Sequence, residues 1–385
     1  MTTQFEPLIE DEYHDSPNKR TLEVILRKRR DGRRAVGTYC AYAPGELIRA
    51  MDAIPVSLCA YSESTIAAAE QVLPANLCPL IKSSYGFIVT DSCPFFAVAD
   101  AVIAETTCDG KKKMFELISH SKPMHVMDLP QLPDEPEAVP AWTGMIRKLK
   151  GFLEGTFATP ISDARIEAEI RATNRKNRLM GRIFAYAALR PSVLGWSEMY
   201  DVISLANAYD ADELDALAEV LVAKLERRAA SGLGLGAPGA PRVLVGGCPV
   251  GGDSAKVFRI LEQAGGVVVA LDSCSGMKPF SMVIEEGTGD PVAALARAYL
   301  TIPCACMSPN IRRLEHLDRM IERYRPDVVV DVVLQACHAY NIESSRIREH
   351  AQGRHGLPFL KIETDYSNAD AERIRTRVEA LFESR

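Results

Sequence analysis

The sequence has no apolar run long enough to cross a bilayer. Runs such as "VVVA" and "AVIA" are far shorter than the ~20 residues that a membrane-spanning helix needs. It also lacks a strong positive charge, because the formal net charge is −6 at pH 7, and this argues against nucleic acid as a partner. The amino terminus, "MTTQFEPLIEDEYHD", shows no basic segment followed by an apolar one, as a signal peptide would. We therefore expect a cytoplasmic protein that binds neither membranes nor nucleic acid.

Several motifs of catalysis and nucleotide binding are also missing. There is no P-loop of the form GxxxxGK[ST], no HExxH, and no Ser-His-Asp arrangement that would favour a hydrolase. The stretch "LVGGCPVGGDSAKVF" follows neither the P-loop pattern nor GxGxxG. We interpret it as a tight turn between a strand and a helix, with binding of an acyl-CoA pyrophosphate as the alternative.

Short apolar runs alternate with helical stretches in two regions of the chain. Strands that alternate with helices imply parallel sheets and βαβ crossovers. We therefore predict an α/β fold of two flavodoxin-like parallel-sheet domains with a helical insert between them. The expected segments are an N-terminal extension (1–32), a first α/β domain (33–135), a helical region (136–230), a Gly/Pro-rich linker (231–241, "SGLGLGAPGAP") and a second α/β domain (242–385).

The ten cysteines are the most informative feature of the chain. Disulfides are rare in the cytosol, so such an accumulation more often indicates metal binding or catalysis. In each half, three expected strands end on a cysteine, and another cysteine precedes the third strand. If the strand ends of the two domains face each other, these thiols gather in one cleft. The strand-end residues are Cys40, Cys59 and Cys108 in the first half and Cys248, Cys274 and Cys337 in the second, and the preceding ones are Cys78 and Cys304.

An iron–sulfur cluster is the occupant that the spacing favours. Structural zinc sites usually show a CxxC pair, which is absent, whereas a cluster can take its ligands from distant loops. The alternative is packing, because a free cysteine is often a small buried residue, and we expect this for about four of the ten. We favour packing for Cys40, Cys59 and Cys248, which end apolar strands.

Four stretches resemble the 2-hydroxyacyl-CoA dehydratase and benzoyl-CoA reductase family: "GTYCAYAPGELIRAMDAIPVSLC", "LCPLIKSSYGF", "ETTCDGKKKM" and "LQACHAYNIES". The resemblance extends from about residue 20 to the end of the chain. It implies two α/β domains per subunit, with a [4Fe–4S] cluster held between them by three thiolates. By motif, these thiolates correspond to Cys78, Cys108 and Cys337.

Three further stretches, "TDSCPFF", "LDSCSG" and "IPCACMSPN", resemble the double-cubane cluster proteins within that family. This resemblance implies an [8Fe–9S] double cubane on six thiolates. Cys93, Cys274 and Cys304 are the candidates for the additional three ligands, and Cys306 competes with Cys304 because one residue separates them.

Some polar residues near these thiols could also act in catalysis. His338 and Glu343 are our candidates for proton delivery, and Glu105 is a further one; a buried, hydrogen-bonded histidine is the ordinary alternative for His338. We interpret the three lysines that follow Cys108 as the exposed edge of a helix. The alternative is that they offset the negative charge of a cluster or face an electron-donating partner.

The main hypothesis is an iron–sulfur reductase component, expected as a homodimer, that reduces a small substrate at a double-cubane cluster. The resemblance implies that its electrons come from a separate ATP-hydrolysing activator with its own [4Fe–4S] cluster. One alternative is a 2-hydroxyacyl-CoA dehydratase subunit, a lyase component, whose single [4Fe–4S] cluster binds an acyl-CoA thioester. The other is a cluster-binding sensor without enzymatic activity.

Overall fold

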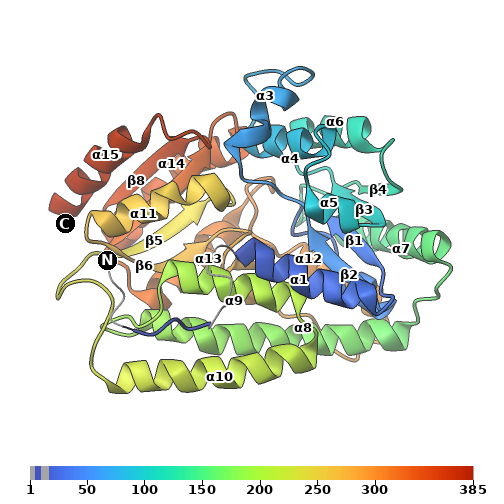
Figure 1. Ribbon diagram of the computed structural model, residues 1–385, viewed down its shortest axis with the longest axis horizontal. Helices are drawn as coiled ribbons and strands as arrows, with labels where there is room; N and C mark the ends of the chain where they lie inside the picture. The colour runs from blue at the N-terminus through green and yellow to red at the C-terminus, as the bar shows by residue number, and fades with distance from the viewer. Residues whose placement is uncertain (1–4, 10–16, 385) are drawn as a thin grey trace.

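Two four-stranded parallel sheets form the centre of the molecule. The computed structural model describes residues 5–9 and 17–384. The strand order is β2-β1-β3-β4 in the first sheet and β6-β5-β7-β8 in the second, as Figure 1 shows. The strands are β1 (Ala35–Thr38), β2 (Ile54–Ser57), β3 (Ala101–Glu105), β4 (Met124–Met127), β5 (Arg242–Gly247), β6 (Val267–Asp272), β7 (Val328–Leu334) and β8 (Phe359–Thr364).

The strands form at the short apolar runs of the sequence. Every residue of β3, β5, β6 and β7 is buried, as expected for parallel strands that helices cover on both faces. β1 pairs with β2 and β3, and β5 has the equivalent central place between β6 and β7. This order is that of the first four strands of a flavodoxin-like sheet. The predicted α/β class with two such sheets is therefore confirmed.

Helices connect the strands of the first sheet and lie on its two faces. Pro79 and Pro94 take the first position of α4 and α5, where a missing backbone N–H leaves no hydrogen bond unmade. The helices of this half are α1 (Pro17–Arg30), α2 (Gly45–Ala50), α3 (Ile66–Ala69), α4 (Pro79–Val89), α5 (Pro94–Val98) and α6 (Asp109–Ile118), with the 3-10 turn η1 (Glu63–Thr65).

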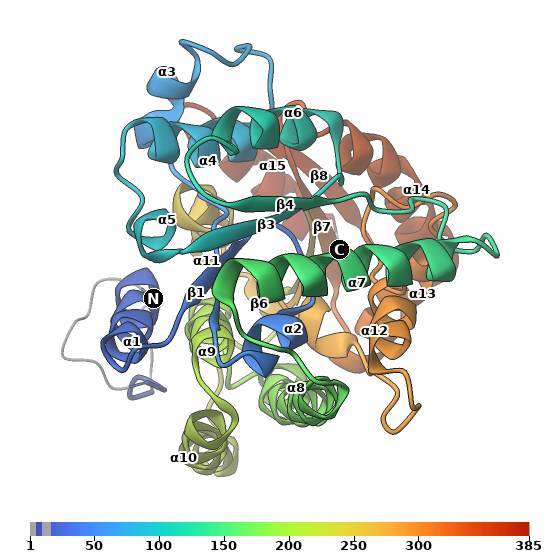
Figure 2. The same ribbon diagram turned by 90° about the vertical axis from the view of Figure 1, so that its right-hand side faces the viewer.

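A helical segment follows the first sheet and packs against both halves of the molecule. The helices are α7 (Ala138–Phe157), α8 (Asp163–Phe184), α9 (Trp196–Ala208) and α10 (Ala211–Ala230), with the 3-10 turn η2 (Ala185–Ala188). Ile166 and Ile170 of α8 are buried in the core of the first half, whereas Met180 and Ile183 are buried in that of the second. Figures 1 and 2 show α8 and α10 side by side beneath the sheets. Residues 231–241 then lead to β5 without helix or strand.

One helix of the second half crosses to the first. Leu295 and Tyr299 of α12 are buried together with Trp142 of α7 and Leu47 of α2. The helices of the second half are α11 (Lys256–Gln263), α12 (Pro291–Tyr299), α13 (Ile311–Tyr324), α14 (His338–His355) and α15 (Ala371–Glu383), with the 3-10 turns η3 (Gly252–Ala255) and η4 (Lys278–Ser281). The two halves thus share this hydrophobic cluster rather than meeting at a thin interface.

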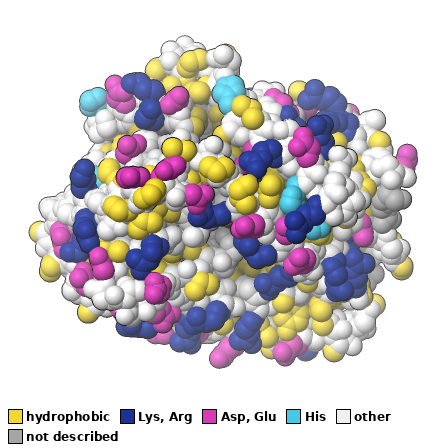
Figure 3. All heavy atoms as spheres, turned by 180° about the vertical axis from the view of Figure 1, so that it is seen from behind, with side chains coloured by type: hydrophobic (Ala, Val, Ile, Leu, Met, Phe, Trp, Pro, Cys, Tyr) yellow, Lys and Arg dark blue, Asp and Glu magenta, His cyan; other side chains and the backbone are white. Residues whose placement is uncertain are grey.

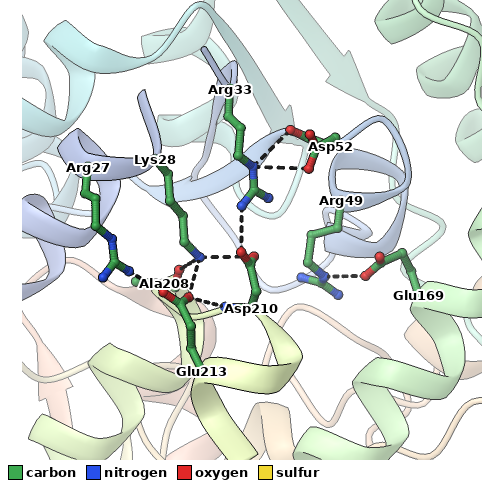
Figure 4. Close-up of polar contacts among 9 residues, drawn as sticks. All are labelled: Arg27, Lys28, Arg33, Arg49, Asp52, Glu169, Ala208, Asp210 and Glu213. Carbon is green, nitrogen blue, oxygen red and sulfur yellow. Dashed lines mark hydrogen bonds and ion pairs between the residues drawn. The ribbon is translucent and has the colours of Figure 1, made fainter. Parts of the chain in front are cut away.

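Buried and half-buried ion pairs attach α1 to the start of α10, as Figure 4 shows. Lys28 Nζ lies 3.0 Å from Asp210 Oδ1 and 2.9 Å from Glu213 Oε2, and it donates a hydrogen bond to the Ala208 carbonyl at 2.7 Å. Arg33 Nη1 contacts the second oxygen of Asp210 at 2.6 Å. The end of the expected N-terminal extension is therefore packed on the helical segment; residues 1–4 and 10–16 of it lie outside the described residues.

The surface is mixed in charge on the face that Figure 3 shows. Lysine and arginine side chains alternate there with aspartate and glutamate, so no large field of one sign covers this face. Among the described helices, none is long and apolar enough to span a membrane.

The packing of α12 leads to a prediction about stability. Leu295 is fully buried between the halves, so replacing it with alanine should lower the free energy of unfolding by about 2–5 kcal/mol. The matched control is Leu117→Ala on α6, because that leucine is 43% exposed and should cost less than about 1 kcal/mol. Urea unfolding followed by circular dichroism measures both, and equal losses would contradict the shared core.

Candidate functional site

A large cavity lies where the carboxyl ends of the two sheets face each other. Its volume is about 2020 Å³, and all ten cysteines of the chain line it. The loops after β1, β2 and β3 supply Cys40, Cys59 and Cys108 to its wall, and the loops after β5, β6 and β7 supply cysteines from the opposite side. The structure therefore confirms that thiols from both halves gather in one cavity.

Four of these cysteines stand immediately before the first residue of a helix. Cys78 precedes α4, Cys93 precedes α5, Cys108 precedes α6 and Cys337 precedes α14. The Cys93 and Cys108 sulfurs accept backbone N–H groups from the first turns of their helices, at 3.3 and 3.5 Å. Free N–H groups at a helix start favour the thiolate, which is the form that binds metal.

The first thiol group consists of Cys78, Cys248 and Cys337 and joins the two halves. A hydrogen bond with Cys337, followed by burial, raises the pKa of the Cys78 thiol well above its usual range. A hydrogen bond with Cys248 is the largest cause that raises the pKa of Cys337. Cys248 is 1% exposed, and its sulfur accepts the Leu334 N–H at 3.4 Å. The three thiols therefore lie near one another in the cavity wall, one from the first half and two from the second.

The second thiol group consists of Cys274, Cys304 and Cys306. Hydrogen bonds from Cys274 and Cys306 hold the pKa of the Cys304 thiol well below its usual range, while the partners' own pKa values rise. Cys306 Sγ lies 3.9 Å from the Tyr42 hydroxyl of the first half. Cys40 is close enough to interact electrostatically with this group, and burial raises the pKa of Cys40 to about 12.

The remaining thiols lie between or beside the two groups. Cys59 Sγ donates a hydrogen bond to the Tyr39 carbonyl at 2.8 Å. Cys108 is exposed to the cavity, and Cys93 is half-buried. Cys40, Cys59 and Cys248, for which packing was expected, do contact the core, but they line the cavity as well. The structure thus leaves all three available as ligands.

The spacing of the thiols fits a cluster of several metal atoms better than a single ion. Four thiolates around one zinc ion, with bonds of 2.3 Å, would lie about 3.8 Å apart. Within residues 5–9 and 17–384, the only three metal-binding side chains whose ligand atoms all lie within 4.8 Å of one another are Asp318, His350 and His355. That group lies on α13 and α14 and does not line the cavity.

Lys111 corrects our interpretation of the three lysines as an exposed helix edge. It is 8% exposed, and its Nζ donates a hydrogen bond to the Tyr39 carbonyl at 3.2 Å. Only Lys112 and Lys113 are exposed. The sequence held a signal for this, because Lys111 falls on the same helical face as the buried Met114 and Ile118.

Glu105, at the end of β3, is a fully buried carboxyl group. Neither of its oxygens has a hydrogen-bond partner among the described side chains and backbone groups. Burial raises the pKa of Glu105 from 4.5 to about 8, and the nearby Lys111 offsets only part of this effect. With a pKa near 8, the carboxyl is mostly protonated at neutral pH.

Buried charges surround the second thiol group, and no sequence motif had indicated them. Lys278 Nζ lies 3.4 Å from Asp272 Oδ1, and His316 Nε2 lies 3.2 Å from the same oxygen. Burial alone would raise the pKa of Asp272, but Lys278, His316 and Arg313 hold it well below its usual range. Lys278 therefore has a carboxylate partner, whereas Lys111 has none.

The two expected proton donors lie in different positions. His338, the first residue of α14, is exposed and lines the cavity, so the alternative of a buried histidine does not hold. Glu343 does not line the cavity. Its carboxylate lies 3.0 Å from Arg313 Nε and accepts a hydrogen bond from Asn310 at 2.6 Å, and the same amide group donates to the Cys304 carbonyl. Glu343 can therefore act on the site only through its neighbours.

Comparison with known proteins places the chain in a family. The sequence model described as 2-hydroxyglutaryl-CoA dehydratase, D-component, matches residues 40–384, so the chain belongs to that family. The chain is also 41% identical over 378 residues to YjiM of Escherichia coli (strain K12), which is provisionally named as a dehydratase subunit. The match covers 98% of both proteins. The resemblance of the sequence motifs to the 2-hydroxyacyl-CoA dehydratase family is therefore confirmed.

The burial of Glu105 leads to a prediction about pH. Its raised pKa means that the folded state keeps this proton between pH 4.5 and 8 while the unfolded state releases it, so wild-type stability falls as the pH rises through this range. Glu105→Gln cannot lose a proton. Its stability relative to wild type should therefore increase with pH and reach roughly 3 kcal/mol more at pH 7 than at pH 4.

Urea unfolding at several pH values measures this difference. Glu349→Gln, on an exposed face of α14, is the matched control and should show no such trend. A constant difference between Glu105→Gln and wild type across pH 4–8 would mean that Glu105 is ionised in the folded state.

Proposed function

We propose that the cavity holds an iron–sulfur cluster on cysteine thiolates, and that the chain is the cluster-binding subunit of an enzyme of its dehydratase family. One observation carries this proposal: all ten thiols, from positions spread over almost 300 residues, line one cavity between the two sheets. Packing alone would not bring every cysteine of a chain to the same wall.

The donor set fits such a group in its chemistry. Thiolates are the usual ligands of iron–sulfur clusters, and those at helix starts receive N–H groups that stabilise a cluster's negative charge. The buried thiols hold their protons when no metal is near, because burial and contact with one another raise the pKa of most of them. Binding of iron would release these protons.

The two thiol groups favour the [8Fe–9S] double cubane over one [4Fe–4S] cluster. We assign Cys78, Cys108 and Cys337 to one cubane, and Cys274 and Cys304 to the other, with Cys93 as the sixth ligand. Cys248 lies beside Cys337 and Cys306 lies beside Cys304, so each could replace a ligand of its group. A second thiol group has no role if a single cubane occupies the cavity.

The activity that we propose is reduction of a small substrate with low-potential electrons. The cluster would supply the electron storage and transfer, and the exposed His338 lies in the cavity wall, where it can hand over a proton. The sequence has no P-loop, and no GxGxxG directly follows a strand, so the electrons would come from a separate ATP-hydrolysing activator with a [4Fe–4S] cluster. We also propose that the chain works as a homodimer.

The second candidate is dehydration of a 2-hydroxyacyl-CoA by a subunit with one [4Fe–4S] cluster. The family description and the provisional name of YjiM favour it. In this case the cavity would also have to admit the acyl-CoA thioester, and a different second subunit would be expected. The two candidates share the same cavity and differ in cluster size and substrate.

Iron content separates the two candidates. Anaerobically purified protein should contain about eight iron atoms and about nine acid-labile sulfides per chain if the double cubane is present, and about four of each for a single cluster. Colorimetric iron and sulfide assays, normalised to amino-acid analysis, make the measurement. Values near zero after anaerobic reconstitution would overturn the proposal as a whole.

Cysteine variants test which thiols hold the cluster. Cys78→Ser and Cys337→Ser should each lose at least half of the bound iron, because both are assigned as ligands of the first cubane. Cys59→Ser is the matched control: its hydroxyl can still donate to the Tyr39 carbonyl, and its iron content should equal that of wild type. Equal iron in all three variants would show that these two sulfurs are not ligands.

A further inference from the structure

Lys111 is a buried cation whose neighbours differ from those of the two lysines beside it. Lys112 pairs with Asp109 at 3.0 Å and Lys113 pairs with Glu116, both on the exposed surface of α6. Lys111 instead turns inward and reaches from α6 to the end of β1, where it donates to the Tyr39 carbonyl at 3.2 Å. It also lines the cavity. Three consecutive lysines thus include one that faces the thiols.

No carboxylate neutralises Lys111. Within the described part of the chain it forms no ion pair, and its one side-chain hydrogen bond goes to a neutral carbonyl group. The nearby Glu105 carboxyl is buried without hydrogen-bond partners and is mostly protonated at neutral pH. Lys278, the other buried lysine of the cavity wall, pairs with Asp272 instead. Lys111 is therefore a net positive charge in the wall, and Lys278 is part of a neutralised pair.

The thiols nearest to Lys111 come from three different loops. Cys108 Sγ accepts the backbone N–H of Lys111 at 3.5 Å, and Cys59 Sγ shares the Tyr39 carbonyl with its ammonium group. Cys40 also lies close enough to interact electrostatically with Lys111. A charge in this position acts directly on whatever the thiols bind, because little water is present to screen it.

We propose that Lys111 is the fixed positive charge that sets the reduction potential of the cluster in this cavity, an inference that rests on the proposed function. Reduction adds an electron and makes a thiolate-bound cluster more negative. A buried cation beside it stabilises the reduced state more than the oxidised state, so it makes the cluster easier to reduce. Lys111 acts on the cluster through its charge and is not itself a ligand.

The test compares four proteins loaded with iron and sulfide under anaerobic conditions. Lys111→Gln removes the charge and keeps a hydrogen-bond donor, and Lys111→Arg keeps the charge. Lys112→Gln, one residue away and exposed, is the matched control. Equilibrium redox titration, followed by visible absorption and electron paramagnetic resonance, gives the midpoint potential of each.

We expect Lys111→Gln to shift the reduction equilibrium at least tenfold toward the oxidised cluster, which is 59 mV for a one-electron couple. Lys112→Gln should change it less than threefold, and Lys111→Arg should stay close to wild type. Wild-type protein that binds no cluster would overturn the proposed function and this inference together. A loaded cluster with the same potential in wild type and Lys111→Gln would overturn the inference alone.

A variant that does not bind the cluster also tests the proposed role of Lys111. If Lys111→Gln lacks iron, Lys111→Met, which keeps much of the apolar stem, takes its place with the same expected shift. If neither loads while Lys111→Arg does, the charge is needed for assembly of the cluster, and the proposed effect on the potential is wrong.

Discussion

The meeting of two parallel sheets at their carboxyl ends is the constraint on which the site depends. In a parallel sheet every strand ends at the same edge, so the loops that follow the strands are neighbours even when the sequence separates them widely. Two such edges facing each other double the number of loops around one volume. Six of the ten thiols lie in loops that directly follow a strand, and the other four lie farther along the β2–β3 and β6–β7 connections, which also border the cavity.

Such a wall would be costly if its charges were unbalanced. Ionised thiols so close together repel one another, and a buried carboxylate without a partner is strongly disfavoured. In the second half, Lys278, His316 and Arg313 form ion pairs with Asp272 and balance its buried charge. The first half has no such ion pair at the equivalent place, because Glu105 is protonated and Lys111 donates only to a carbonyl group. The two sides of the cavity therefore present different electrostatic environments to anything bound between them.

Much of the fold could be predicted from the sequence, because each of the eight strands is a short apolar run bounded by turn residues. Most of the thiol constellation could be predicted as well, since all the cysteines except Cys304 and Cys306 fall at strand ends or before helices. Contacts between distant helices could not. The apolar face of α12 indicates a buried helix but not that its partners, such as Trp142, belong to the other half. The position of Glu343 behind the cavity wall depends in the same way on Arg313 of α13, which no local pattern reveals.

Helix α8 has a mechanical consequence. It is 22 residues long, about 33 Å at 1.5 Å per residue, and its two ends are embedded in different cores. A rotation of one sheet away from the other would have to bend α8 or expose the buried side chains at one of its ends. The packing of α8 thus resists any change in the distance between the thiols on opposite sides of the cavity.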